Sequence, residues 1–231
     1  HSEVIDWERV RLSCRAVRAE QFAAAVFAIG VKHLGFEPIG GWAEPDELPL
    51  LEDVYNFEDA LLVGAMLITF LKNADRVKVA CLAQLVNVIA PIMTREKGGA
   101  WAQTIFYPMM DASMYGRGKS LRPIITTDKH DTKHFNDVPV VDAAATMDDA
   151  GNVTIFAVNR DLSEPVKLQL DMRAFGEMKP EFHTVLHHDD MKAINTEENP
   201  DEVKPVQVPV VIEDDCIILP AASWNVIRFT K

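Results

Sequence analysis

One nearly unbroken apolar run limits the fold of this chain more than any other feature. Residues 77–83 are apolar apart from Lys78, and the apolar character continues through 85–89. Such runs are typical of strands that are covered on both faces, as in parallel sheets. Gln84 and Asn87 interrupt the run near its carboxyl end. Because ligands bind at that end of the strands in α/β folds, the run predicts a candidate substrate edge.

Helical patterns flank this strand on both sides. Residues 52–73 are expected to form a long helix, since Pro49 precedes them and acidic residues fill the first turns. A glycine-containing loop follows the strand, and a second helix is expected from about Trp101 to Tyr115. A helix, a parallel strand and a helix are part of a repeating βα unit. They are too few to close an eight-stranded barrel, which needs about 250 residues.

The pattern changes to a period of two after Ser120. A turn at 148–152 precedes an apolar strand and predicts a hairpin, whereas the polar, proline-containing segment 195–209 is expected to be a loop. Further short strands are expected at 154–158, 166–170, 182–186, 216–219 and 226–229. Regularly spaced short strands separated by turn signals predict a β-sandwich.

Composition excludes several classes of partner and site. The chain has 231 residues and a net charge of −12, which argues against nucleic acid or an anionic membrane and suits a neutral ligand. Its cysteines are three in number with no close pairs, so neither a disulfide framework nor a zinc site is expected. We expect Cys81 to be a small buried apolar residue in a reducing cytoplasm. The charged start predicts no secretory signal, and the longest apolar run, 61–71, is too short to span a bilayer.

Several long strings of the sequence carry a family resemblance. They lie at 49–61, 74–94, 103–108, 115–118, 131–133, 156–160 and 223–228. In these strings the chain resembles the C-terminal part of the α-L-arabinofuranosidases of glycoside hydrolase family 51. The resemblance covers roughly residues 42–231. It implies the last helices and strand of a (β/α)8 TIM barrel at 42–118 and a β-sandwich C-terminal domain at 119–231. Residues 1–41 stay unassigned, and native sequence, an insertion and a wrongly joined segment are all open for them.

The resemblance also implies the chemistry of the family and where this sequence departs from it. Retaining glycosidases use two carboxyl groups about 5 Å apart, a nucleophile and an acid/base. In family 51 the nucleophile is a glutamate followed by tryptophan and asparagine, and the acid/base is a glutamate preceded by asparagine. Neither motif occurs here, and the nearest strings, 6–8 and 42–44, do not match. No catalytic residue is therefore assigned, and the chain alone is expected to be inactive.

The candidate substrate-binding residues are Gln84, Asn87 and Trp101. By resemblance Gln84 matches the glutamine at the end of the eighth barrel strand, which hydrogen-bonds the arabinose in the −1 subsite. A side-chain amide both donates and accepts, which suits vicinal sugar hydroxyls. Asn87 fits a structural role better, and Trp101 either flanks the sugar or packs the loop. The string 187–190, His-His-Asp-Asp, cannot converge on a metal from one strand, so no metal or cofactor is expected.

The expected function is the hydrolysis of terminal α-L-arabinofuranosyl residues from arabinan and arabinoxylan oligosaccharides. The resemblance implies a cytoplasmic homo-oligomer, a hexamer in the family, with no nucleic acid or membrane partner. One alternative is a non-catalytic β-sandwich module that binds carbohydrate or a partner chain. Another is a new site built from 1–41, with Asp6 or Glu8. A truncated barrel would leave an unpaired edge at residues 77–84, so the chain alone is expected to be oligomeric or poorly soluble.

Overall fold

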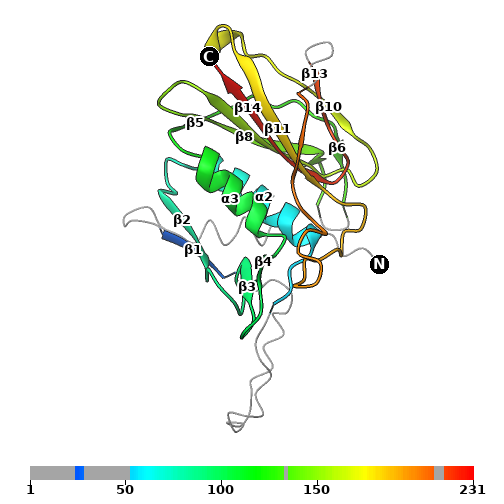
Figure 1. Cartoon of the computed structure of the whole chain (residues 1–231). Helices are drawn as coiled ribbons and strands as arrows, with labels where there is room; N and C mark the ends of the chain where they lie inside the picture. Colours follow the sequence, from blue (N-terminus) through cyan, green and yellow to red (C-terminus); the bar gives the residue numbers. More distant parts are fainter. Residues whose placement is uncertain (1–23, 29–52, 133–134, 211–215) are drawn as a thin grey trace.

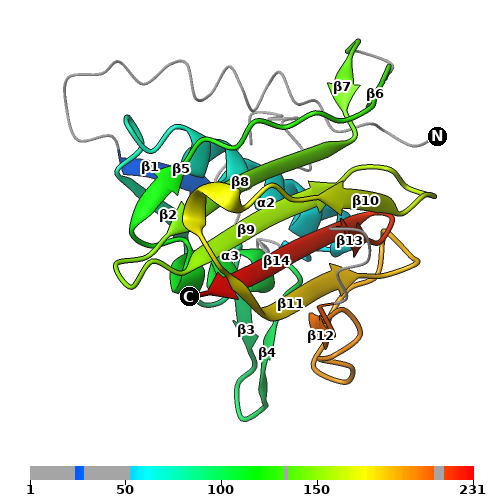
Figure 2. The same ribbon diagram turned by 90° about the horizontal axis from the view of Figure 1, so that it is seen from above.

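A six-stranded antiparallel sheet dominates the computed structural model, which describes residues 53–132, 135–210 and 216–231 and the backbone of 24–28. Figure 2 shows this sheet from above. Its strands lie in the order β12 (Val206–Val208), β11 (Lys179–His187), β14 (Ser223–Thr230), β9 (Val153–Asn159), β8 (Val141–Met147) and β5 (Lys119–Leu121). The strands expected from the period of two coincide with or overlap strands of this sheet and of the small sheet described next.

The second layer of the sandwich is small. It consists of β10 (Val166–Gln169) paired antiparallel with β13 (Cys216–Leu219). Ile217 and Leu219 of β13 pack with Ile155 and Ile227 of the large sheet in one apolar cluster. The predicted β-sandwich is therefore confirmed. The central strand β9 is buried along its whole length, because this small layer covers one of its faces and helices cover the other.

The hairpin predicted at 148–152 is also confirmed, since it joins β8 to β9. The Asp148 carboxylate accepts the backbone N–H groups of Ala150 and Asn152, at 3.0 and 2.9 Å. Gly151 has a φ of 84°, a left-handed conformation that glycine adopts without steric cost. The sequence-based prediction lacked β8, because its run of alanines has little β propensity. It also lacked β12, which lies in the segment predicted to be a loop.

Helix α2 (Phe57–Lys72) is shorter than predicted. It begins at Phe57 and not at residue 52, because Asn56 caps it. The Asn56 side chain accepts the Asp59 N–H, and the Asp59 carboxylate accepts the Asn56 N–H, at 3.1 and 2.8 Å. This reciprocal capping box satisfies N–H groups that have no partner within a helix. Val54, within the predicted range 52–73, therefore lies outside the helix and is 53% exposed.

The segment between the apolar strand and the second helix is a β-hairpin. Its strands are β3 (Ile92–Thr94) and β4 (Ala100–Ala102), and the helix α3 (Phe106–Tyr115) begins after them. Trp101 thus lies in a strand, and the prediction of a helix from Trp101 was wrong at its start. Three short elements complete the description: β6 (Lys129–His130), β7 (Val138–Pro139) and the 3-10 helix η1 (Arg173–Phe175).

The apolar run forms the strand β2 (Val79–Ala83), which pairs in parallel with β1 (Ala24–Ala28). Ala80 and Leu82 pack against α2 and α3, but Val79 is 51% exposed and Cys81 is exposed too. The prediction of a strand covered on both faces, with a buried Cys81, was therefore wrong. The physical reason is that the described helices cover only one face. The strand also ends at Ala83, so the run beyond it is not a strand.

One edge of β2 is occupied by β1, so the predicted unpaired edge applies, among the described residues, only to the opposite side. Figure 1 shows the resulting layers, with α2 and α3 between the six-stranded sheet and the strands β1–β4. No helix in the part of the chain that the structure describes is long and apolar enough to cross a membrane.

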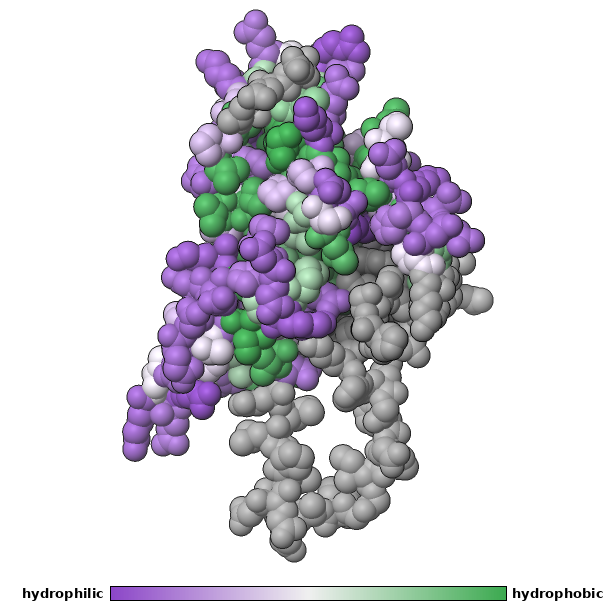
Figure 3. Space-filling view, turned by 90° about the vertical axis from the view of Figure 1, so that its right-hand side faces the viewer, coloured by the Kyte–Doolittle hydropathy of each residue, from purple (hydrophilic) through white to green (hydrophobic). Residues whose placement is uncertain are grey.

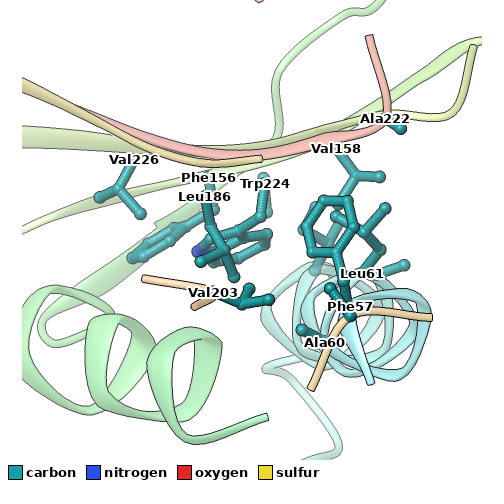
Figure 4. Close-up of a cluster of buried hydrophobic side chains, with 14 residues drawn as sticks. Phe57, Ala60, Leu61, Phe156, Val158, Leu186, Val203, Ala222, Trp224 and Val226 are labelled. Atoms are coloured by element: carbon teal, nitrogen blue, oxygen red, sulfur yellow. The ribbon is translucent and has the colours of Figure 1, made fainter. Parts of the chain in front are cut away.

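Trp224 of β14 joins the sheet to both helices. Its side chain is 1% exposed and stacks on Phe156 with ring centroids 5.8 Å apart (Figure 4). Its indole N–H donates to the Asp111 carboxylate of α3 at 2.9 Å. On α2, a Cβ atom at Gly64 would lie 2.5 Å from Cε3 of the indole. The tryptophan therefore packs directly on the α2 backbone and is anchored by α3.

We expect Asp111→Asn to stabilise the protein above pH 6. Burial raises the pKa of Asp111 from 3.8 to about 6, and the Trp224 hydrogen bond offsets part of that rise. The folded state thus holds a proton that the unfolded chain releases, so stability falls as pH rises from about 4 to about 6. At about 1.4 kcal/mol per pKa unit, the cost at pH 7 is about 3 kcal/mol. An asparagine still accepts the indole N–H, and we expect a gain of about 1–2 kcal/mol at pH 8 and none at pH 4.

Urea unfolding at pH 4, 6 and 8 checks this prediction. The exposed variant Asp201→Asn is the control, since it removes one carboxylate without touching Trp224. An unchanged pH slope in Asp111→Asn would show that this carboxyl group does not carry the titration.

A second substitution, Gly64→Ala, tests the contact with α2. Alanine is favoured over glycine in a helix interior by about 1 kcal/mol. Its Cβ atom would nevertheless collide with the indole, and overpacking of a core costs about 1–3 kcal/mol. We therefore expect a net loss of stability in chemical denaturation. A more stable variant would mean that Trp224 can move away from α2 at little cost.

Candidate functional site

Gln84 follows β2 directly, at the carboxyl end of the parallel pair β1–β2. The peptide bond between Ala83 and Gln84 is cis. The Gln84 side chain is exposed and makes no hydrogen bond within the described part of the chain. Its amide can therefore both donate to and accept from a polar ligand, as the sequence predicts for this position.

Asn87 has a different environment, since its amide is occupied. Its backbone is left-handed, with a φ of 61°, and its N–H donates to the Ile92 carbonyl at 2.8 Å. Its side chain donates to Thr94 Oγ1 at 2.9 Å and accepts the Thr94 N–H at 2.7 Å. Asn87 thus fastens the segment after β2 to the strand β3. This arrangement matches the structural role that the sequence favoured for it.

Trp101 lies on the same hairpin, opposite Met93 of β3. It is half-buried, and the Arg95 guanidinium lies 5.7 Å from the centroid of its ring. A cation over an aromatic face at this distance is a favourable contact. The hairpin therefore presents Arg95 stacked on Trp101 of β4. Its strand β3 binds the segment that follows Gln84, through Thr94 and Asn87.

A loop of the sandwich reaches this hairpin. Residues 188–205, which we call the sandwich loop, connect β11 to β12. From it, Glu197 accepts the Gly99 N–H at 2.8 Å and pairs with Arg95 Nε at 3.0 Å. The sandwich thus contacts the edge of the α/β part where Gln84 and Trp101 lie.

Gln103 connects the segments around the candidate site through buried hydrogen bonds, and the sequence analysis did not single it out. It is 2% exposed, and its side-chain N–H groups donate to the carbonyls of Asp53 and Ala90, at 3.1 and 2.8 Å. Its side-chain oxygen accepts the Tyr55 N–H at 2.9 Å. The next residue, Thr104, donates to the Asn56 carbonyl at 2.6 Å. A Gln-Thr pair directly before an apolar helix was the available signal for such a buried anchor.

The acidic pair Glu58–Asp59 at the start of α2 is engaged in structure. Asp59 belongs to the capping box, and Glu58 pairs with Lys192 of the sandwich loop. No group of His, Cys, Asp or Glu in the described residues could hold a metal ion. The strings at 6–8 and 42–44, together with Asp6 and Glu8, lie outside the described residues.

A concave surface lies on the sandwich, between β11, β12 and β13. This groove has a volume of about 460 Å³ and is lined mainly by apolar side chains such as Val185, Val206 and Ile218. His183 lines it too, but its ring Nε2–H donates to the Asn225 side-chain oxygen at 3.0 Å, and burial lowers the pKa of His183. On the side of the molecule seen in Figure 3, apolar residues form a band between hydrophilic ones. The groove has few free polar groups with which to orient a sugar.

The described chain is thus a β-sandwich packed on α/β elements, with the exposed amide of Gln84 at the end of a parallel strand. The chain belongs to the family described as the alpha-L-arabinofuranosidase C-terminal domain, whose model matches residues 37–223. The predicted resemblance to family 51 is thereby confirmed.

Named relatives agree with this assignment. The intracellular exo-alpha-(1->5)-L-arabinofuranosidase of Halalkalibacterium halodurans is 50% identical over 86% of this chain and 42% of its own length. The enzyme of the same name from Acetivibrio thermocellus is 52% identical over 79% of this chain and 37% of its own length. The solved structure of AbfB, a family 51 enzyme from Bifidobacterium longum, has a TM-score of 0.74 at 41% identity, covering 79% of this chain and 35% of that chain. This chain therefore spans less than half the length of these relatives.

Two substitutions at Asn87 separate its two roles. Asn87→Gly keeps the left-handed backbone accessible but removes the bonds to Thr94, so we expect a loss of about 1 kcal/mol. Asn87→Ala removes the same bonds and adds the cost of a left-handed alanine, about 1 kcal/mol more. Chemical denaturation of the two variants measures the difference. Equal stabilities would show that backbone conformation at this position carries no cost.

Proposed function

We propose that this chain is the C-terminal portion of a retaining α-L-arabinofuranosidase that removes terminal α-L-arabinofuranosyl residues from arabinan and arabinoxylan oligosaccharides. The observation that carries the proposal is the exposed amide of Gln84 at the end of a parallel strand, in a chain of this family. The names of the relatives support the reaction class. The catalytic glutamates would come from a part of the enzyme upstream of this chain.

In this proposal the residues of the chain bind and orient substrate and do not carry the chemistry. Gln84 donates to one sugar hydroxyl and accepts from its neighbour in the −1 subsite, which fixes the ring between the two carboxyl groups. The hairpin places Trp101 beside the sugar. Asn87 holds the segment between them through Thr94. No cofactor or metal takes part.

The exposed face of β2 supports the assignment of residues 42–118 to the end of a (β/α)8 barrel. Val79 is 51% exposed and Cys81 is exposed too, which is unusual for apolar residues of a parallel strand. We propose that the preceding barrel strands cover them in the whole enzyme. The β-sandwich domain begins at 119, in line with the pairing of β5 with β8. The cytoplasmic location and the homo-oligomer, a hexamer in the family, are parts of the same proposal.

The alternative of a non-catalytic sugar-binding module has less support. Such modules bind sugar rings with exposed aromatic side chains. Phe156, Trp224 and Phe229 of the sandwich are buried, with exposed fractions of 0%, 1% and 3%. The groove beside β13 is apolar, as described above. Neither these buried aromatic residues nor the apolar groove provides the exposed aromatic surface that such a module uses.

A chimera tests the proposal. The segment of the Halalkalibacterium halodurans relative that precedes its counterpart of residue 53 is joined to residues 53–231 of this chain, and hydrolysis of an aryl α-L-arabinofuranoside is measured. We expect an active chimera, and we expect the 231-residue chain alone to be inactive. Gln84→Ala should lower kcat/KM at least about 30-fold, since two hydrogen bonds to the substrate are worth about 2 kcal/mol or more.

Gln169→Ala is the matched control, because Gln169 is an exposed glutamine of β10 on the sandwich. Its kcat/KM should equal that of the parent chimera. Wild-type activity in Gln84→Ala would remove Gln84 from the substrate site, and hydrolysis by the isolated chain would require a catalytic site within it.

A further inference from the structure

The sandwich loop is anchored at the start of α2. The Ala193 and Met191 carbonyls accept the N–H groups of Phe57 and Glu58, at 2.9 and 3.0 Å. Lys192 pairs with the Glu58 carboxylate. The first N–H groups of a helix have no partner within the helix, so these backbone bonds satisfy them. The loop is thus attached to the α/β part at a defined point.

The same loop reaches the hairpin through two side chains. Asn195 is 3% exposed, and it donates to the Ala102 carbonyl of β4 at 3.0 Å and to Val203 within the loop at 2.9 Å. Glu197 binds both the Gly99 N–H and Arg95 Nε. Glu197 therefore lies on a loop that is attached both to the start of α2 and to the β3–β4 hairpin.

The contact between Glu197 and the turn is close. A Cβ atom at Gly98 would lie 2.7 Å from the carboxylate oxygen that accepts the Gly99 N–H and 2.9 Å from Arg95 Cβ. Any side chain at 98 would therefore push the carboxylate or the arginine aside. The glycine allows the close approach on which both bonds of Glu197 depend.

Arg95 needs this partner in order to keep one position. Its side chain is 64% exposed, whereas that of Glu197 is 29% exposed. A long exposed arginine has many rotamers, and holding it costs conformational entropy. The charge-assisted bond to Glu197 offsets that cost and places the guanidinium over Trp101.

The hairpin also leads back to Gln84. Val86 forms a bridge with Ile92, and Asn87 binds Thr94 through side chain and backbone. Thr94 is followed directly by Arg95. The position of the hairpin and that of the segment carrying Gln84 are thus coupled through β3.

We propose that Glu197 is a positioning residue, which holds Arg95 and Trp101 as a wall for the leaving-group part of an arabinofuranosyl oligosaccharide. This inference rests on the function proposed above and adds a task for the sandwich. Glu197 does not touch the reacting atoms. Its loss should therefore weaken the binding of a long substrate and leave the turnover of a small one nearly unchanged.

Hydrogen exchange on the full 231-residue chain tests the positioning itself. In Glu197→Ala we expect the Gly99 amide to exchange about 10-fold faster or more, because it loses its acceptor. Gly98→Ala should also make the Gly99 amide exchange faster, because the added methyl group would displace the Glu197 carboxylate. Asp201→Asn is the matched control on the same loop, since the Asp201 carboxylate pairs with Lys204 within the loop and not with the hairpin, and it should leave the exchange unchanged. An unchanged Gly99 rate in Glu197→Ala would overturn the proposal.

Kinetics in the chimera test the consequence for substrate. With α-1,5-arabinotriose we expect Glu197→Ala to raise KM about 3- to 10-fold with kcat within two-fold, since an exposed ion pair is worth about 1 kcal/mol. With α-L-arabinofuranosyl azide, which has almost no leaving group to contact the wall, KM should stay within two-fold. Arg95→Ala should show the same split.

Three outcomes decide between the claims. Equal changes for both substrates would indicate a merely structural role for Glu197 and overturn the inference, as would unchanged kinetics in a variant whose hairpin exchanges faster. A parent chimera with no activity would count against the proposed function. The exchange experiment on the chain alone would then still decide whether Glu197 holds the hairpin.

Discussion

The packing of Trp224 between the sheet and the two helices is the contact on which the rest of the structure depends. The sheet offers the indole a stacked Phe156, α2 approaches through Gly64, and α3 binds the N–H through Asp111. An aromatic ring of this size removes a large apolar area from water, so it dominates the local packing energy. Its single polar atom is satisfied in the same place.

A second contact fixes the direction of α3. Arg228, four residues beyond Trp224 on β14, lies 5.6 Å from the ring of Tyr115, the last residue of α3. Its guanidinium binds Asp148 at 2.7 Å, Glu181 at 2.9 Å and Thr154 at 2.9 Å. The large sheet therefore holds the second half of α3, at Asp111 and at Tyr115. Because α3 follows the hairpin closely in sequence, the sandwich restrains the site in two ways, through α3 and through the sandwich loop.

Local sequence patterns identified much of the fold correctly. The short apolar runs of β9 and β14 and the turn at 148–152 predicted the sandwich, because these signals depend on neighbouring residues alone. The same reasoning misplaced the start of α2, since acidic residues before Asn56 look like a first turn until the capping bonds are seen. It also extended β2 too far, because apolar residues such as Leu85 were taken as strand although they lie in an exposed, irregular segment.

The sequence by itself determined the family and the sandwich, because these depend on residue identity and short-range periodicity, whereas the substrate-binding role of Gln84 stays a prediction. Only the tertiary structure decided that Asn87 is occupied by Thr94, that Trp101 lies in a hairpin, and that Glu197 reaches that hairpin. Glu197 and Gly99 are 98 positions apart in the chain. No periodicity or local propensity extends so far, and such contacts arise only once the sheet and helices are packed together.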